Sequence, residues 1–169
     1  MAEELSLREY CIPCKSKCCQ TGDSIASPIL DHEEVRAIYD KTQQDVFREV
    51  TTPSGVYYLI REQEGTNRCA FLTPENKCRI QDTKPLDCLC YPIKAAYDYY
   101  GGICFVIDED CSAAKHLTSE FIKKAKEIAL KSLLRFNKGV YQHWIDNQEL
   151  WVKGAARLDD FLDRLHSKE

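Results

Sequence analysis

The spacing of apolar residues predicts two helices in the first third of the chain. Asp31 followed by Glu34 has the pattern of a capping box, in which two side chains satisfy backbone N–H groups at a helix start. Val35 and Ile38 then fall on one face, as the 3.6-residue period of a helix requires. The segment 45–50 is predicted to form a short second helix.

Runs of β-forming residues predict a small antiparallel sheet in the middle of the chain. Residues 55–60 are rich in tyrosine, valine and isoleucine, which favours a strand. Residues 95–100 and 103–107 flank Gly101 and Gly102, and glycine accepts a positive φ without steric cost. This part of the chain therefore predicts a β-hairpin.

Helical periodicity returns in the last third of the sequence. From Thr118 onwards, apolar residues recur at every third or fourth position as far as Phe136. A second helix is expected after Gly139, and a third, amphipathic one over 158–165. Between the predicted sheet elements, the proline-containing segment 69–93 is expected to form loops and short turns.

Together these patterns predict an α+β fold: a small antiparallel sheet with cysteine-rich, metal-binding loops and C-terminal helices. Residues 1–116 form the cysteine-cluster region, and residues 117–169 form a helical C-terminal layer of the same domain. We expect one domain because the length suits one, and no segment rich in proline, glycine or serine separates the two regions.

The composition excludes several classes of function. With 44% hydrophobic and 30% charged residues in 169, the chain has the balance of an ordinary globular protein. Its net charge of −4 lacks the basic footprint of a nucleic-acid binder, so no nucleic-acid partner is expected. The seven glycines do not have the spacing of a phosphate-binding loop. The unusual feature is ten cysteines.

The start of the sequence predicts the compartment in which these thiols lie. Residues 1–5 are acidic, and no apolar stretch of the kind found in signal peptides follows. No segment approaches the roughly 20 apolar residues needed to cross a bilayer, so no membrane association is expected. We therefore expect a cytoplasmic protein with reduced thiols. The alternative is a secreted chain whose leader has been removed and whose cysteines form disulfides.

The first cysteine cluster has the spacing of a metal-binding motif and comprises Cys11, Cys14, Cys18 and Cys19. A pair separated by two residues places two sulfur atoms on one tight turn. Thiolates are soft ligands that suit zinc and iron–sulfur clusters. Adjacent cysteines point to different sides of the backbone, so Cys18 and Cys19 either serve two metals or divide between a metal and the core.

The second cluster is spread over three loop turns and comprises Cys69, Cys78, Cys88 and Cys90. The spacings between Cys69, Cys78 and Cys88 are too wide for a single metal knuckle, but they fit ligands delivered by separate turns. Cys111 follows an acidic turn and is available as a ligand. Cys104 lies within an apolar strand and is predicted to be a buried structural thiol.

The order of these motifs resembles the YkgJ-type cysteine cluster family, whose members are described as zinc- or iron-chelating domains. The resemblance covers residues 8–115 and rests on Cys11-x2-Cys14-x3-Cys18-Cys19, Cys69-x-Phe71-Leu72, Cys78-x-Ile80, Lys84-Pro85-x-x-Cys88, Tyr91-Pro92 and Cys111. It implies that the metal ligands are Cys11, Cys14, Cys18, Cys19, Cys69, Cys78, Cys88 and Cys111. The chain departs from the family pattern at Lys84 and Leu89, where arginine is usual, and in the additional Cys90.

Eight ligands suit either two four-sulfur sites or one larger shared cluster, and the implied cofactor is zinc or iron, including an iron–sulfur cluster. Zinc has no redox chemistry and would act mainly as a scaffold. An iron–sulfur cluster would allow electron transfer or radical initiation.

Two alternatives remain. Some relatives with this cysteine pattern are described as flagellin lysine N-methylases, which implies an iron–sulfur enzyme acting on protein lysine. The other alternative is a zinc-stapled module that binds a protein partner. The sequence assigns no catalytic residue.

Overall fold

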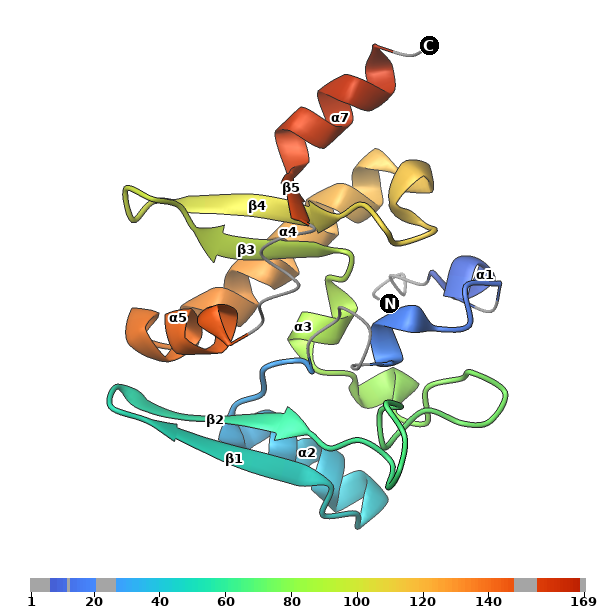
Figure 1. Cartoon of the computed structure of the whole chain (residues 1–169), viewed down its shortest axis with the longest axis vertical. Coiled ribbons are helices and arrows are strands. Elements are labelled where there is room, and N and C mark those ends of the chain that lie inside the picture. Colours follow the sequence, from blue (N-terminus) through green and yellow to red (C-terminus); the bar gives the residue numbers. More distant parts are fainter. Residues whose placement is uncertain (1–6, 12, 21–26, 148–154, 168–169) are drawn as a thin grey trace.

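The computed structural model has an α+β fold with two small antiparallel sheets, one in each half of the molecule (Figure 1). It describes residues 7–11, 13–20, 27–147 and 155–167. The strands are β1 (Phe47–Thr52), β2 (Gly55–Ile60), β3 (Ile93–Tyr97), β4 (Ile103–Asp108) and β5 (Ala155–Arg157). The α-helices are α1 (Arg8–Cys11), α2 (His32–Thr42), α3 (Leu86–Leu89), α4 (Ser119–Leu134), α5 (Lys138–Asp146) and α7 (Leu158–His166). The predicted fold class is confirmed, with its sheet divided in two.

The lower half of Figure 1 contains the β1–β2 hairpin and α2. The capping box predicted from the sequence is present, because Asp31 accepts the N–H of Glu34 and the Glu34 side chain accepts the N–H of Asp31. Ile38 on the buried face of α2 joins a small core with Phe47 and Phe71. Local polar and apolar patterns therefore determine this helix.

The prediction of a helix over residues 45–50 is wrong. Strand β1 occupies most of this segment, and it pairs in full register with β2, from Phe47 opposite Ile60 to Thr52 opposite Gly55. Strand preference reflects packing against neighbouring strands more than an intrinsic backbone tendency. The partner strand therefore decides the structure of this segment.

The upper half contains the three-stranded sheet, in the order β3-β4-β5. The predicted hairpin is present as β3 and β4, and its turn uses a positive φ of 81° at Gly101. The Asp98 carboxylate accepts the N–H groups of Tyr100 and Gly102, which closes the turn. Strand β5 is absent from the sequence prediction, because its three residues have no β-forming pattern and are paired only through the edge of β4.

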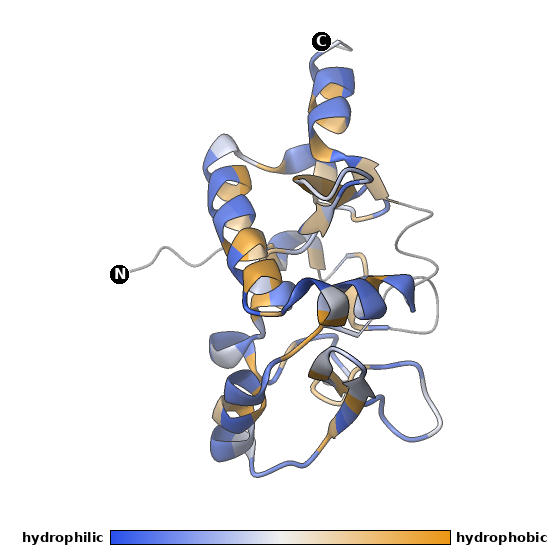
Figure 2. Cartoon of the chain, turned by 90° about the vertical axis from the view of Figure 1, so that its left-hand side faces the viewer, coloured by the Kyte–Doolittle hydropathy of each residue, from blue (hydrophilic) through white to orange (hydrophobic). Residues whose placement is uncertain are grey.

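The helix predicted from Thr118 onwards is present as α4, which begins at Ser119 with Thr118 as its cap and packs against β3. Hydrophobic and hydrophilic residues divide around α4 and around α7, which ends near the C-terminus (Figure 2). Phe121 and Leu133 of α4 share one core with Ile93 and Ile107 of the sheet. The described part of the C-terminal region is thus packed directly on the cysteine-bearing region. Among the described residues, no helix has both the length and the apolar character required to cross a membrane.

Two neighbouring leucines of α4 provide a test of this packing. Leu133 is fully buried, whereas Leu134 is 59% exposed. We expect Leu133→Ala to lower the free energy of unfolding by about 2–5 kcal/mol, because it leaves a cavity in the core. Leu134→Ala is the matched control and should change the free energy by less than about 0.5 kcal/mol. Urea denaturation followed by circular dichroism measures both, and equal losses would contradict the packing described.

Candidate functional site

Backbone hydrogen bonds hold the first cysteine cluster against the loop that carries Cys69. The Cys69 N–H donates to the Cys19 carbonyl at 2.7 Å, and Gln20 forms a β-bridge with Arg68. The Ser16 side chain, in a residue only 4% exposed, donates to the Asn76 carbonyl at 2.8 Å. The end of the N-terminal segment, which comprises residues 7–11 and 13–20, is thereby fixed to the lower half of the molecule.

The beginning of the same segment contacts the upper half. The Tyr10 ring stacks on the His116 ring with centroids 5.2 Å apart. The Ser112 hydroxyl donates to the Tyr10 carbonyl at 3.3 Å. Residues 10–11 and 13–20 therefore connect the loop after β4 with the loops after β2, and the loops on both sides carry cysteines.

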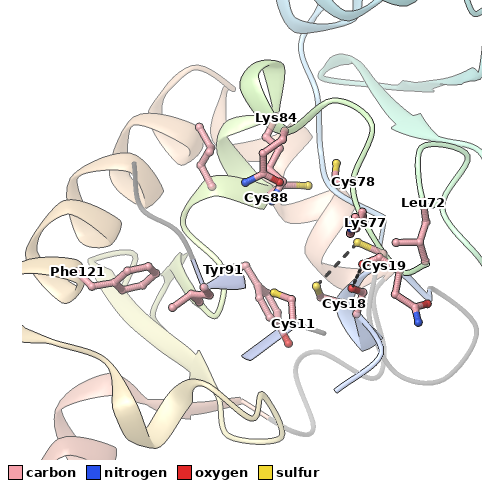
Figure 3. Close-up of a pocket in the computed structure, with 15 residues that line it drawn as sticks. Cys11, Cys18, Cys19, Leu72, Lys77, Cys78, Lys84, Cys88, Tyr91 and Phe121 are labelled. Atoms are coloured by element: carbon pink, nitrogen blue, oxygen red, sulfur yellow. Dashed lines mark hydrogen bonds between the residues drawn. The ribbon is translucent and has the colours of Figure 1, made fainter. Parts of the chain in front are cut away.

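A small cavity of about 90 Å³ lies where these segments meet (Figure 3). Five cysteine residues line it: Cys11, Cys18, Cys19, Cys78 and Cys88. Lys84 and Tyr91 are among the other residues that line it. Figure 3 shows Cys18 and Cys19 on the N-terminal segment, with Cys78 from a loop and Cys88 from α3 on other sides of the cavity.

A larger cavity of about 490 Å³ adjoins the first, since Cys11, Cys18 and Tyr91 line both. Four cysteines line this second cavity, and we name them the Cys111 group: Cys11, Cys14, Cys18 and Cys111. Asp108 and Asp110 lie on the same wall as Cys111. The second cavity is therefore flanked by thiols and carboxylates together.

Cys69 belongs with the cysteines of the first cavity, as its electrostatics show. Burial raises the pKa of Cys69 to about 12, and the charges of Cys19 and Cys78 act in the same direction. Burial also raises the pKa of Cys88 well above its ordinary value, as do Asp87, Cys19 and Cys69. We name these four thiols the Cys88 group: Cys19, Cys69, Cys78 and Cys88.

The thiols of the Cys111 group influence one another in the same way. Burial raises the pKa of Cys111 to about 11, and Asp108, Cys14 and Cys11 add to this effect. Burial and then the charge of Cys14 raise the pKa of Cys11. Bringing several such groups together as thiolates is unfavourable unless a positive charge compensates them.

Cys18 and Cys19 join the two groups. Their sulfur atoms lie 4.0 Å apart and share a hydrogen bond. This hydrogen bond raises the pKa of Cys18 well above its ordinary value and lowers that of Cys19 to about 7, an effect that Lys84 and Arg68 reinforce. Four thiolates around one zinc at about 2.3 Å would lie about 3.8 Å from one another, so at this pair the two groups approach each other almost as closely as two ligands of one metal do.

Two polar residues accompany the thiols. The charge of Lys84 lowers the pKa of Cys19 and opposes the effect of burial at Cys11 and Cys78. The Tyr91 hydroxyl donates to the Asp108 carboxylate at 2.6 Å. Burial, followed by the charge of Asp108, raises the pKa of Tyr91, so the phenol remains neutral in the wall between the cavities.

The two remaining cysteines lie outside both groups. Cys90 was assigned to the second cluster by spacing, but it is buried in the main hydrophobic core and its thiol donates to the Asp87 carbonyl at 3.5 Å. Cys104 lies in β4 opposite Ala96 and is half-buried, rather than buried as predicted. All ten cysteines are free thiols, so the disulfide alternative is not observed.

The two cysteine groups have the donor chemistry of a metal site, but their side chains are not yet in coordinating positions. Thiols are the donors that zinc and iron–sulfur clusters prefer, and the eight expected cysteines form two adjoining groups. Within the parts of the chain that the structure describes, no three cysteine, histidine or acidic side chains already stand at positions that could hold a metal ion. The residues fit in donor chemistry and grouping, and their side chains would have to turn inward to coordinate.

Sequence reasoning did not connect Lys84 or Asp108 with the thiols. The acidic turn beside Cys111 was the available signal for Asp108. In the sequence, Lys84 stands out only as a departure from the family pattern, because its proximity to Cys19 depends on the folding of separate loops.

Comparisons with protein-family models, with curated proteins and with solved structures give no significant match for this chain.

Thiol reactivity tests the electrostatics of the site. Because thiolates are the reactive form and the pKa of Cys19 is about 7, Cys19 should be alkylated first in the reduced, metal-free protein at pH 7. Its rate should level off above about pH 8, while that of Cys69 continues to rise. Short pulses of iodoacetamide followed by peptide mass spectrometry measure both rates. Equal labelling of Cys69 and Cys19 at pH 7 would show that the described charges are incorrect.

Proposed function

We propose that this protein binds zinc or iron through eight cysteine thiolates arranged in the Cys88 group and the Cys111 group. One observation carries the proposal: seven of these cysteines, from distant parts of the sequence, line two adjoining cavities, and the backbone of the eighth, Cys69, is hydrogen-bonded to that of Cys19. The same eight cysteines are those that the resemblance to the YkgJ-type family implies. The division into two groups favours two four-sulfur sites over one shared cluster.

The electrostatics of the thiols support a cation as the natural occupant. Burial and mutual repulsion raise the pKa of Cys69, Cys88 and Cys111, so these thiols retain their protons when no cation is present. A metal ion must displace those protons, and its affinity should therefore increase as the pH rises. Lys84 already offsets part of the negative charge at Cys19.

A bound metal would also stabilise the fold. The Cys88 group joins the N-terminal segment to the loops after β2, and the Cys111 group joins it to the loop after β4. Structural zinc in small peptides contributes on the order of 10–16 kcal/mol at neutral pH. Metal removal is therefore expected to loosen the first 115 or so residues more than the helices that follow.

An enzyme is a second candidate, and the larger cavity is the observation that favours it. Its volume of about 490 Å³ lies within the range of small-molecule sites, and the Cys111 group lines it. An iron–sulfur centre held by these thiols would lie beside any molecule bound there. This is the arrangement that the methylase-like alternative requires, and metal identity separates it from a zinc scaffold.

Purification without oxygen tests the proposal directly. We expect two zinc ions per chain in a colourless protein, or iron with acid-labile sulfide in a brown one, measured by elemental analysis and absorption spectroscopy. Zinc would exclude the redox and radical alternatives for this site. Protein that contains no metal, and takes up neither zinc nor iron when reduced, would refute metal binding.

Single cysteine substitutions test the division into two groups. Cys78→Ser and Cys111→Ser should each remove about half of the bound metal, because a three-thiolate site binds far more weakly. Cys104→Ser is the matched control and should retain all of it, since Cys104 lies outside both groups. Loss of all metal in both variants would instead indicate one shared cluster. Loss in the Cys104 control would contradict the ligand assignment.

A further inference from the structure

A buried ion pair lies directly behind the Cys88 group. The Lys94 ammonium is 3.0 Å from the Asp87 carboxylate, and the two side chains are only 4% and 3% exposed. The ammonium also lies over the Trp144 ring, 4.6 Å from its centroid. Trp144 is itself buried in the main core. Two opposite charges are thus enclosed in an apolar region between β3 and α5.

Stability alone does not explain such a pair. Removing two charges from water costs more than their attraction returns in many proteins, and well-packed apolar residues often replace a buried pair without loss of stability. A buried pair does fix geometry, because each charge tolerates few positions other than beside its partner. The residues next to the Asp87–Lys94 pair in the chain therefore indicate which part of the structure the pair positions.

Asp87 immediately precedes Cys88 in α3, a single helical turn. A helix of this length has no stability of its own and takes its orientation from outside contacts. Lys94 of β3 provides one such contact through Asp87. Glu34 of α2 provides another, because its carboxylate accepts the Leu86 N–H at 2.8 Å. Arg135, at the end of α4, in turn forms an ion pair with Glu34.

The orientation of α3 decides whether Cys88, within the helix, or Cys90, its C-terminal cap, reaches the other thiols. Cys88 lines the first cavity, whereas Cys90 points into the core and donates to the Asp87 carbonyl. A rotation of this turn would exchange these environments. Fixing the Asp87 side chain therefore keeps α3 in the orientation that points Cys88 toward the first cavity.

We propose that Asp87 and Lys94 form a positioning pair that holds the Cys88 thiol in the first cavity for metal binding. The inference rests on the proposed function and adds the residues that prepare one of its two sites. Lys94 has a second effect, since its charge offsets that of Asp87 next to Cys88. The pair acts through Cys88 and does not itself coordinate metal.

A paired apolar replacement tests the inference without leaving one charge buried. In Asp87→Leu/Lys94→Met, cobalt(II) should bind the Cys88 group about 10- to 100-fold more weakly, as is typical when partners behind a metal ligand are changed. Binding at the Cys111 group should remain unchanged. Cobalt(II)–thiolate absorption measures each site separately when the titrations are repeated with Cys111→Ser or Cys78→Ser added.

Two further proteins separate positioning from general destabilisation. Leu158→Ala opens a cavity in the core under α7, which lies above the β3–β4 hairpin in Figure 1 whereas α3 lies below it, and should lower stability without changing either cobalt affinity. Asp87→Asn/Lys94→Gln keeps a hydrogen-bonding pair without charges, and its affinity at the Cys88 group should lie closer to that of the original protein. Urea denaturation confirms that each variant is folded, and this polar pair tests the proposal if the apolar pair does not fold.

The outcomes distinguish metal binding itself from the positioning role of the ion pair. If the original protein binds neither cobalt nor zinc nor iron, the proposed function fails and the positioning role fails with it. If it binds cobalt at both groups and the replaced pairs bind equally well, the ion pair is purely structural and the positioning role is overturned. Equal weakening at the Cys88 and Cys111 groups would also overturn it, because the effect would then be global.

Discussion

The site depends on a short stretch of backbone hydrogen bonding between two segments that have little core of their own. The Cys69 N–H donates to the Cys19 carbonyl, and the β-bridge between Gln20 and Arg68 continues this contact. Loops rich in cysteine and polar residues cannot be held by apolar burial to the extent that helices are. Here main-chain bonds and the buried Ser16 hydroxyl set the spacing between the cysteines. This contact fixes the first cysteine cluster against the Cys69 loop, and the other thiols are placed relative to it.

Charged side chains connect the two halves of the fold behind the thiols. Arg135, which closes α4, pairs with Asp31 and Glu34 at the start of α2. Glu34 then meets the first turn of α3. These contacts place the helix that carries Cys88 between the upper and lower cores. The hydrophobic layers therefore supply rigidity, and the polar junction sets the orientation of the functional turn.

Local patterns in the sequence predict the elements that are stable through local rules. The α2 capping box, the helix from Thr118 onwards and the strand over residues 55–60 all have such signals, and each is present. The segment 45–50 and strand β5 take their structure from a neighbouring strand, which no local window contains. Sequence prediction fails at these places for a physical reason.

The candidate site divides in the same way. The cysteine motifs identify eight thiols from spacing and family resemblance, and the fold brings them into two groups. Spacing could not separate Cys88 from Cys90, because the rotation of α3 is determined by Lys94 and Glu34. It also gave no indication that Lys84 lies beside Cys19. Such pairings depend on the path of the chain in three dimensions.

The common wall of the two cavities has a thermodynamic consequence. Cys11, Cys18 and Tyr91 each face both spaces, so an occupant that shifts these side chains on one side reshapes the other side as well. Binding equilibria that share structural elements are linked, and linkage is reciprocal: each occupant changes the affinity for the other by the same factor. With both sites intact, filling one cavity should therefore change the affinity of the other, whereas a variant with one group disabled reports the remaining site alone.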